Sequence, residues 1–144
     1  MKNMKLISTL ALAVFVISAC GDSLNELVIQ GAWARPASAG ENGAAYFVIE
    51  NWTMTDDILL SVNSEIASAT EVHMSMGDDN GVMSMQMQKS IPVPARSQVE
   101  FKPGGLHVMF VSLTRILQVG DTIIITLNFE NAGAIVIEVP VQEP

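Results

Sequence analysis

The sequence predicts a single all-β domain, an antiparallel β-sandwich or barrel. Short segments rich in β-branched and aromatic residues follow one another along the chain, and Gly, Pro, Asn and Asp separate them. No stretch sustains a helical period, and no internal repeat or second domain is evident. The 144 residues are the length of one domain and include enough apolar side chains to build a core.

The first half of the domain is predicted to contain five strands. Residues 27–33 (LVIQGAW) and 43–51 (GAAYFVIEN) are the first two, joined by a loop at 35–40 that is rich in Pro, Ser and Gly. Residues 58–62 follow a polar turn at 53–57 and form the third. Residues 70–76 (TEVHMSM) and 82–88 (VMSMQMQ) form a hairpin, because Gly-Asp and Asn-Gly at 77–81 permit positive φ at low cost.

The second half continues the same pattern of short strands and turns. Two prolines at residues 91–94 predict an edge strand or a loop, because proline cannot donate to a β-ladder. The remaining predicted elements are a short strand at 98–101, a sharp turn at 103–105 (PGG), a strand at 106–113 (LHVMFVSL), and a final hairpin of 121–129 and 134–139.

The N-terminus predicts export and a lipid anchor. Lys2 and Lys5 precede an apolar run of about fourteen residues, which is short for a membrane span and typical of a signal peptide. The run ends in Ile-Ser-Ala-Cys20, which resembles the lipobox of bacterial lipoproteins. We therefore expect a lipoprotein signal peptide (residues 1–19), lipidation at Cys20, a tether (residues 20–26) and a folded domain (residues 27–144). The alternative is a plain cleaved signal followed by a free thiol.

Charge and cysteine usage exclude several classes of function. The net charge of −8 disfavours nucleic-acid phosphates and anionic lipid headgroups, so we expect no nucleic-acid partner and membrane contact through the lipid alone. Cys20 is the only cysteine, which leaves the domain without a thiolate or a disulfide. No Gly-rich phosphate loop is present, and no catalytic constellation stands out.

Histidine and methionine are concentrated between residues 73 and 109. This stretch contains both histidines, His73 and His107, and six of the seven methionines that follow the signal. Because alternate residues of a strand share a face, His107 and Met109 project together while Val108 and Phe110 point into the core. By the same rule Met83, Met85 and Met87 share one face.

The donor types in this cluster favour copper(I). Thioethers are soft and neutral, and with imidazole they suit copper(I), whereas zinc prefers thiolate, imidazole or carboxylate and hard cations prefer oxygen. Each feature alone has a structural interpretation, since methionine often fills irregular cores and a lone histidine is usually structural. The metal hypothesis depends on the convergence of both histidines with most of the methionines in an exported chain.

The spacing resembles that of the PCuAC family of periplasmic copper chaperones. The family motif is His-Met, ten residues, Met, twenty-one residues and His-x-Met, which His73-Met74, Met85 and His107-Val108-Met109 match without gaps. Other segments also resemble the family, namely residues 31–36 (GAWARP), 43–46 (GAAY), 81–83 (GVM), 102–105 (KPGG) and 120–121 (GD). The resemblance covers residues 27–140. It implies a cupredoxin-like β-sandwich that binds copper(I) and delivers it to cytochrome oxidase assembly.

Carried over to this sequence, the motif gives His73, Met85, His107 and Met109 as the metal ligands. Met74 should face away from His73 in a regular strand, so we expect it in the core or beside the ligands. We expect Met76, Met83 and Met87 to serve in packing, with transient contact to the metal as the alternative.

Three functions remain to be weighed for a copper protein of this kind. A metallochaperone would hold copper(I) in a shallow, exposed site and pass it to an acceptor by ligand exchange, so we expect no enzymatic activity. A periplasmic copper buffer or resistance protein would use the same site without a dedicated acceptor, and the sequence does not separate these two. A blue-copper electron carrier needs a thiolate ligand, which the domain lacks.

Overall fold

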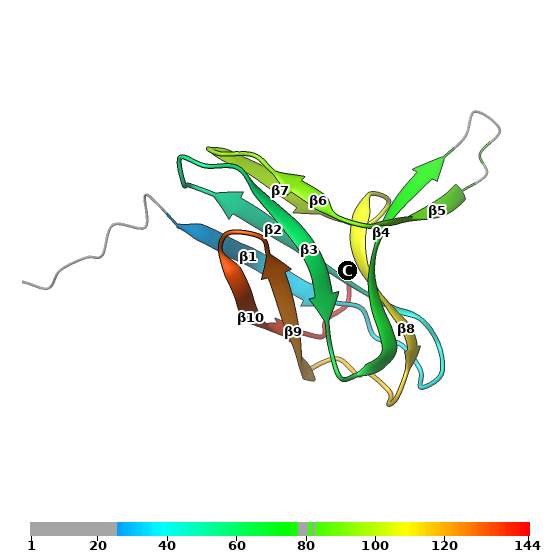
Figure 1. Ribbon diagram of the computed structural model, residues 1–144. Coiled ribbons are helices and arrows are strands. Elements are labelled where there is room, and N and C mark those ends of the chain that lie inside the picture. Colours follow the sequence, from blue (N-terminus) through cyan, green and yellow to red (C-terminus); the bar gives the residue numbers. More distant parts are fainter. Residues whose placement is uncertain (1–25, 78–80, 82) are drawn as a thin grey trace, which may run out of the picture.

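A computed structural model of the chain describes residues 26–77, 81 and 83–144 (Figure 1). These residues form ten strands, and no helix that could span a membrane occurs among them. The predicted signal peptide, Cys20 and the tip of the predicted hairpin at residues 78–80 lie outside the described residues.

The strands assemble into two sheets that pack as a sandwich. The larger sheet has the order β1–β2–β7–β8–β4–β5, and the smaller one has the order β10–β9–β3–β6. The strands of the larger sheet are β1 (Leu27–Ala34), β2 (Gly43–Asn51), β7 (Ser97–Phe101), β8 (Leu106–Leu113), β4 (Ala67–Gly77) and β5 (Met83–Gln88). The strands of the smaller sheet are β10 (Gly133–Pro140), β9 (Thr122–Phe129), β3 (Asp57–Asn63) and β6 (Ile91–Val93). All pairings between strands are antiparallel except the short contact between β7 and β8.

The predicted all-β sandwich is therefore confirmed, and the strand boundaries agree with the alternation in the sequence. The proline-containing segment forms β6 at the edge of the smaller sheet, where a strand can lack one ladder donor. Every other predicted strand is present with its ends moved by a few residues at most, which is the usual uncertainty of strand ends.

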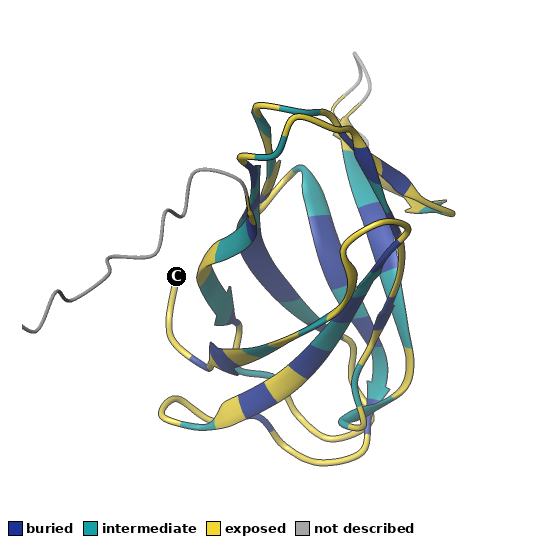
Figure 2. Ribbon diagram, turned by 60° about the vertical axis from the view of Figure 1, so that its left-hand side comes forward, coloured by how far each residue is buried: buried dark blue, intermediate teal, exposed yellow. Residues whose placement is uncertain are grey.

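The core lies between the two sheets and is built from alternate residues of the central strands (Figure 2). Phe47 and Ile49 of β2 and Val108 and Phe110 of β8 are at most 1% exposed, and they belong to the same core cluster as the buried residues of β9. The prediction that Val108 and Phe110 point inward is confirmed. Because successive side chains alternate, burial of these two places His107 and Met109 on the opposite face of β8.

The β4–β5 hairpin extends beyond the rest of the sandwich, as Figure 1 shows. β5 is the edge strand of the larger sheet, and β4 lies between β5 and β8. The two strands pair in regular register from Val72 opposite Gln88 to Gly77 opposite Met83. Among the described residues, this arrangement leaves the face that carries Met83, Met85 and Met87 without a covering layer.

Candidate metal centre

The two histidines lie side by side on the outer face of the larger sheet. His73 of β4 is directly opposite His107 of β8 in the strand register. Their ring centroids are 6.0 Å apart, with the rings tilted by 37°. Two imidazoles on one metal place their ring centres no more than about 6.5 Å apart, given metal–nitrogen bonds of about 2.0 Å. The spacing therefore fits a shared metal ion.

Two methionine sulfurs belong to the same neighbourhood. Met109 follows His107 on the same face of β8, and Met85 of β5 is paired with Ser75, two residues beyond His73. Met85, His107 and Met109 line one cavity of about 470 Å³, together with Met83 and Tyr46. His73 does not line this cavity and adjoins it through His107. The structure thus brings all four predicted ligands to one face of three adjacent strands.

The turn that delivers His107 also orients its ring. Gly104 has φ of +78°, a value that side chains with a Cβ rarely adopt, so glycine allows the sharp reversal before β8. The Gly105 carbonyl accepts a hydrogen bond from His107 Nδ1 at 3.0 Å. Because a carbonyl only accepts, the proton is on Nδ1 and Nε2 carries the lone pair. His107 therefore offers Nε2 to a metal.

The ring of His73 is held through Nε2, whereas that of His107 is held through Nδ1. Its Nε2 lies 2.7 Å from a carboxylate oxygen of Glu71, the residue two positions earlier on the same face of β4. Its Nδ1 is buried and has no hydrogen-bond partner within the described part of the chain. A buried polar atom without a partner costs roughly 1–3 kcal/mol, so it indicates that something absent from the protein itself completes the site. A metal ion with nitrogen ligands fits this position.

Exposure differs sharply between the histidines and the methionines. His73 and His107 are 8% and 5% exposed, whereas Met83, Met85 and Met87 are 63%, 62% and 53% exposed. The expectation of a shallow, exposed site therefore holds for Met85 and is wrong for the two histidines.

The packing role expected for Met76, Met83 and Met87 is also wrong. Met76 is 46% exposed, and none of the three is buried, because none of the described strands or loops covers the projecting hairpin. Met74 is half-buried and pairs with Leu106 and Gln86, on the face opposite His73, as strand alternation predicts. We call Met83, Met85 and Met87 the methionine row from here on.

Tyr46 and Arg35 close another side of the cavity. The Arg35 guanidinium lies 5.6 Å from the centroid of the Tyr46 ring, and the Trp33 ring packs against Tyr46 at 4.7 Å. Burial raises the pKa of the Tyr46 phenol above its ordinary value of 10.0, against an opposing effect of Arg35. The phenol is therefore neutral at pH 7 and adds no anionic donor to the site.

Sequence reasoning did not identify Glu71, Gly105 or Tyr46 as parts of this centre. Glu71 could have been identified from the sequence, because strand alternation places residue 71 on the same face as residue 73. Tyr46 could not have been identified in this way, because its position depends on the pairing of β2 with β8, which residue spacing does not reveal.

Comparison with known proteins identifies relatives in sequence and in structure. Residues 27–141 match the family described as "Putative lipoprotein LpqE-like". The chain is 30% identical over 124 residues to "Putative lipoprotein Lxx21020" of Leifsonia xyli, an alignment that covers 85% of this chain and 74% of that protein.

Solved structures of similar fold include two copper-bound proteins. The copper-bound PCuAC domain from PmoF2 superposes with a TM-score of 0.69 and 27% identity, covering 85% of this chain and 97% of that one. The copper(I)-bound DR1885 of Deinococcus radiodurans superposes with a TM-score of 0.65 and 25% identity, covering 85% and 83%. The resemblance to PCuAC domains and the cupredoxin-like sandwich that it implied are therefore confirmed.

Proposed function

Because the chain belongs to the LpqE-like family and shares the fold of copper-bound PCuAC domains, we propose that it is an exported copper(I) chaperone. The observation that carries the proposal is the histidine pair beside exposed thioethers, in which His73 Nδ1 is buried without a hydrogen-bond partner among the described residues and His107 is bonded through Nδ1. The ligands in this proposal are His73, Met85, His107 and Met109.

This ligand set suits copper(I) better than its competitors. Imidazole nitrogens and thioether sulfurs are neutral, so a monovalent ion enters without a buried anionic ligand. Copper(II) favours harder nitrogen and oxygen donors in a tetragonal arrangement, and zinc would lack the thiolate or carboxylate that it commonly takes. The site therefore binds the reduced ion selectively.

The same geometry supports transfer rather than catalysis. His73 and His107 are nearly closed to solvent, whereas Met85 is 62% exposed and within reach of a donor on another protein. An incoming ligand replaces the exposed thioether first, and copper then moves by stepwise ligand exchange. No bond of an organic substrate is made or broken, so the protein does not act as an enzyme.

The acceptor in this proposal is a copper centre of cytochrome oxidase, reached directly or through a thiol-containing assembly factor. Support comes from the likeness of the chain to PCuAC chaperones. The second candidate is a periplasmic copper buffer, which the same site supports. Deletion of the gene separates the two, because delivery predicts loss of oxidase activity at low copper, whereas buffering predicts only sensitivity to high copper.

A lipid anchor in the periplasm completes the proposal. The sequence places Cys20 after small residues at the end of an apolar run, and both the family and the Leifsonia relative carry the name of lipoproteins. Cys20 would carry the lipid after removal of residues 1–19, and residues 20–26 would tether the domain. Metabolic labelling with a radioactive fatty acid tests this, since Cys20→Ser should abolish the label.

A copper(I) competition titration tests the site. The soluble protein from Ser23 onward is titrated against a chromophoric chelator under anaerobic, reducing conditions. We expect one tight equivalent that is strongly weakened in His107→Ala and Met109→Ala. Met54→Leu is the matched control, because Met54 is 73% exposed and its sulfur contacts Arg96, away from the histidines. Unchanged affinity in the two site variants would contradict the proposal.

A further inference from the structure

We propose that Glu71 is a positioning residue that selects Nδ1 of His73 as the metal-binding nitrogen, while His107 binds through Nε2. The inference rests on the proposed function and adds to it the identity of the donor atoms. It also assigns a role to a carboxylate that lies beside the proposed ligands without belonging to them.

The first step is the direction of the hydrogen bond between Glu71 and His73. A carboxylate only accepts, so the 2.7 Å contact requires the proton of His73 to be on Nε2. In the neutral ring the lone pair is then on Nδ1, and this atom is buried without a hydrogen-bond partner among the described residues. A structural histidine would ordinarily use both ring nitrogens in hydrogen bonds when it is 8% exposed.

The second step is the contrast with His107. Its Nδ1 donates to the Gly105 carbonyl, which leaves Nε2 as the unprotonated nitrogen. The two rings face each other from paired positions at a centroid distance of 6.0 Å. One ring therefore presents the nitrogen nearer its backbone and the other presents the nitrogen farther from it. Two different hydrogen-bond acceptors, Glu71 on β4 and Gly105 in the turn before β8, fix this asymmetry.

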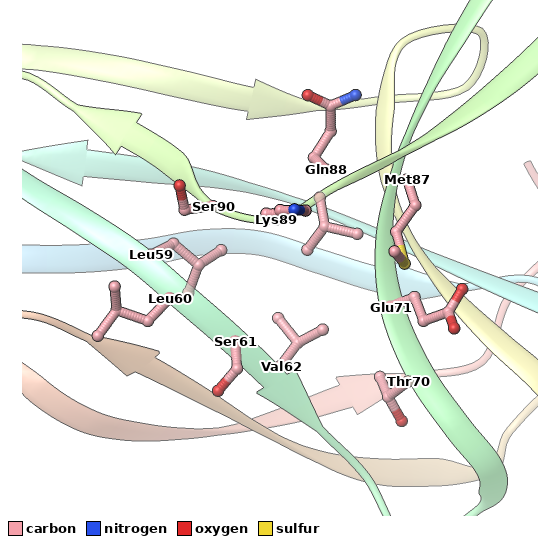
Figure 3. A pocket seen from close by; sticks show the side chains of 11 residues that line it. Leu59, Leu60, Ser61, Val62, Thr70, Glu71, Met87, Gln88, Lys89 and Ser90 are labelled. Carbon is pink, nitrogen blue, oxygen red and sulfur yellow. The ribbon is translucent and has the colours of Figure 1, made fainter.

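The third step concerns charge. The four proposed ligands are neutral, so they do not compensate the single positive charge of copper(I). Glu71 places a carboxylate against the far side of the His73 ring, where it fixes the orientation of the ring and balances the charge without binding the metal. Its side chain is 33% exposed and lines a groove of about 190 Å³ together with Met87 (Figure 3).

The experiment is nitrogen-15 NMR of the histidine rings in the soluble protein from Ser23 onward. In the metal-free protein we expect the proton on Nε2 of His73 and on Nδ1 of His107. On addition of one equivalent of copper(I), the resonances of His73 Nδ1 and His107 Nε2 should shift most. A shift of His73 Nε2 in place of Nδ1 would overturn the inference, because copper would then displace Glu71.

Two variants and a control test the positioning role. Glu71→Ala should leave the His73 proton distributed over both nitrogens and weaken copper(I) binding about 10–100-fold, the usual effect of removing such a partner. Glu71→Gln keeps an acceptor for Nε2–H, so it should restore the single protonation pattern. Glu138→Ala removes an exposed carboxylate from β10 in the other sheet and should change neither measurement.

The outcomes separate this inference from the proposed function. Copper(I) binding that is equal or tighter in Glu71→Ala would show that the carboxylate is idle or competes with the metal, and would overturn the inference alone. Failure of the wild-type protein to bind copper(I) would overturn the proposed function and the donor assignment with it.

Discussion

Methionine oxidation offers a test of the proposed centre that needs no substitution. Sulfoxide formation follows exposure, and the sulfoxide is a harder, bulkier and more polar group than the thioether. Met54 and the methionine row are all more than half exposed, so dilute peroxide should oxidise them first. One equivalent of silver(I), a soft monovalent ion without redox chemistry under these conditions, should protect Met85 and Met109 while Met54 reacts at its unprotected rate.

The structure sets the size of the two expected effects. Full burial of a methionine side chain is worth about 1.5–3 kcal/mol, and the row methionines keep 53–63% of their surface exposed. Oxidation of each should therefore cost no more than about 1.5 kcal/mol of folding free energy. Loss of the Met85 thioether as a ligand should weaken copper(I) binding at least about tenfold, or ~1.4 kcal/mol. Binding should thus fail while the domain remains folded.

Peptide mass spectrometry measures the oxidation rate of each methionine, and a thermal melt of the oxidised protein measures stability. The protection ratio of Met85 to Met54 is the decisive number, because both side chains are exposed to a similar extent before silver is added. If bound silver leaves the oxidation rates of Met85 and Met109 unchanged, the soft metal binds elsewhere and the reasoning is refuted. Protection of Met54 to the same degree would point to non-specific binding.

Three further predictions concern the scaffold. Asp57→Ala should destabilise the fold by about 3 kcal/mol or more in urea unfolding without changing copper(I) affinity, because the buried carboxylate accepts three backbone N–H bonds of 2.7–2.9 Å in the smaller sheet. Gly43→Ala should cost about 1–3 kcal/mol, since its Cβ would lie 3.2 Å from the ring of buried Phe110. Gly105→Ala should cost less, because the nearest atom to its Cβ would belong to the flexible Lys102 side chain at 3.3 Å. The pKa of Asp121 is lowered from 3.8 by the Gln118 N–H and by Arg115, so its carboxylate stabilises the fold above pH 3.8. This stabilisation is lost as the pH falls through the lowered pKa. Thermal melts of Asp121→Asn should therefore lack this part of the loss of stability in acid.

The larger part of the fold could be predicted because strand alternation is a local property. The pattern of residues 106–113 by itself separates Val108 and Phe110 from His107 and Met109, and the structure retains that separation. The edge position of β6 likewise follows from its prolines, since a missing N–H is tolerated only where no neighbouring strand requires it.

Exposure of the methionine row could not be predicted in the same way. Alternation shows that Met83, Met85 and Met87 share a face, but whether that face is covered depends on the layer above it. The smaller sheet ends at β6 and packs on the opposite side, so no element of the described part of the chain covers the hairpin on this face. Apolar composition alone favours a buried row, and this is why the packing assignment failed.

The proposed histidine and methionine ligands differ in exposure. This difference bears on how the proposed site would hold and release copper. His73 and His107 are fixed by hydrogen bonds to Glu71 and to the turn before β8, so their rings are held in place without a metal. Met85 lies on an edge strand with most of its surface in solvent, so its sulfur can detach without disturbing the core. If copper is bound as proposed, retention depends on the histidines and exchange on the thioether. Variation along β5 would then change the rate of transfer more than the stability of the fold.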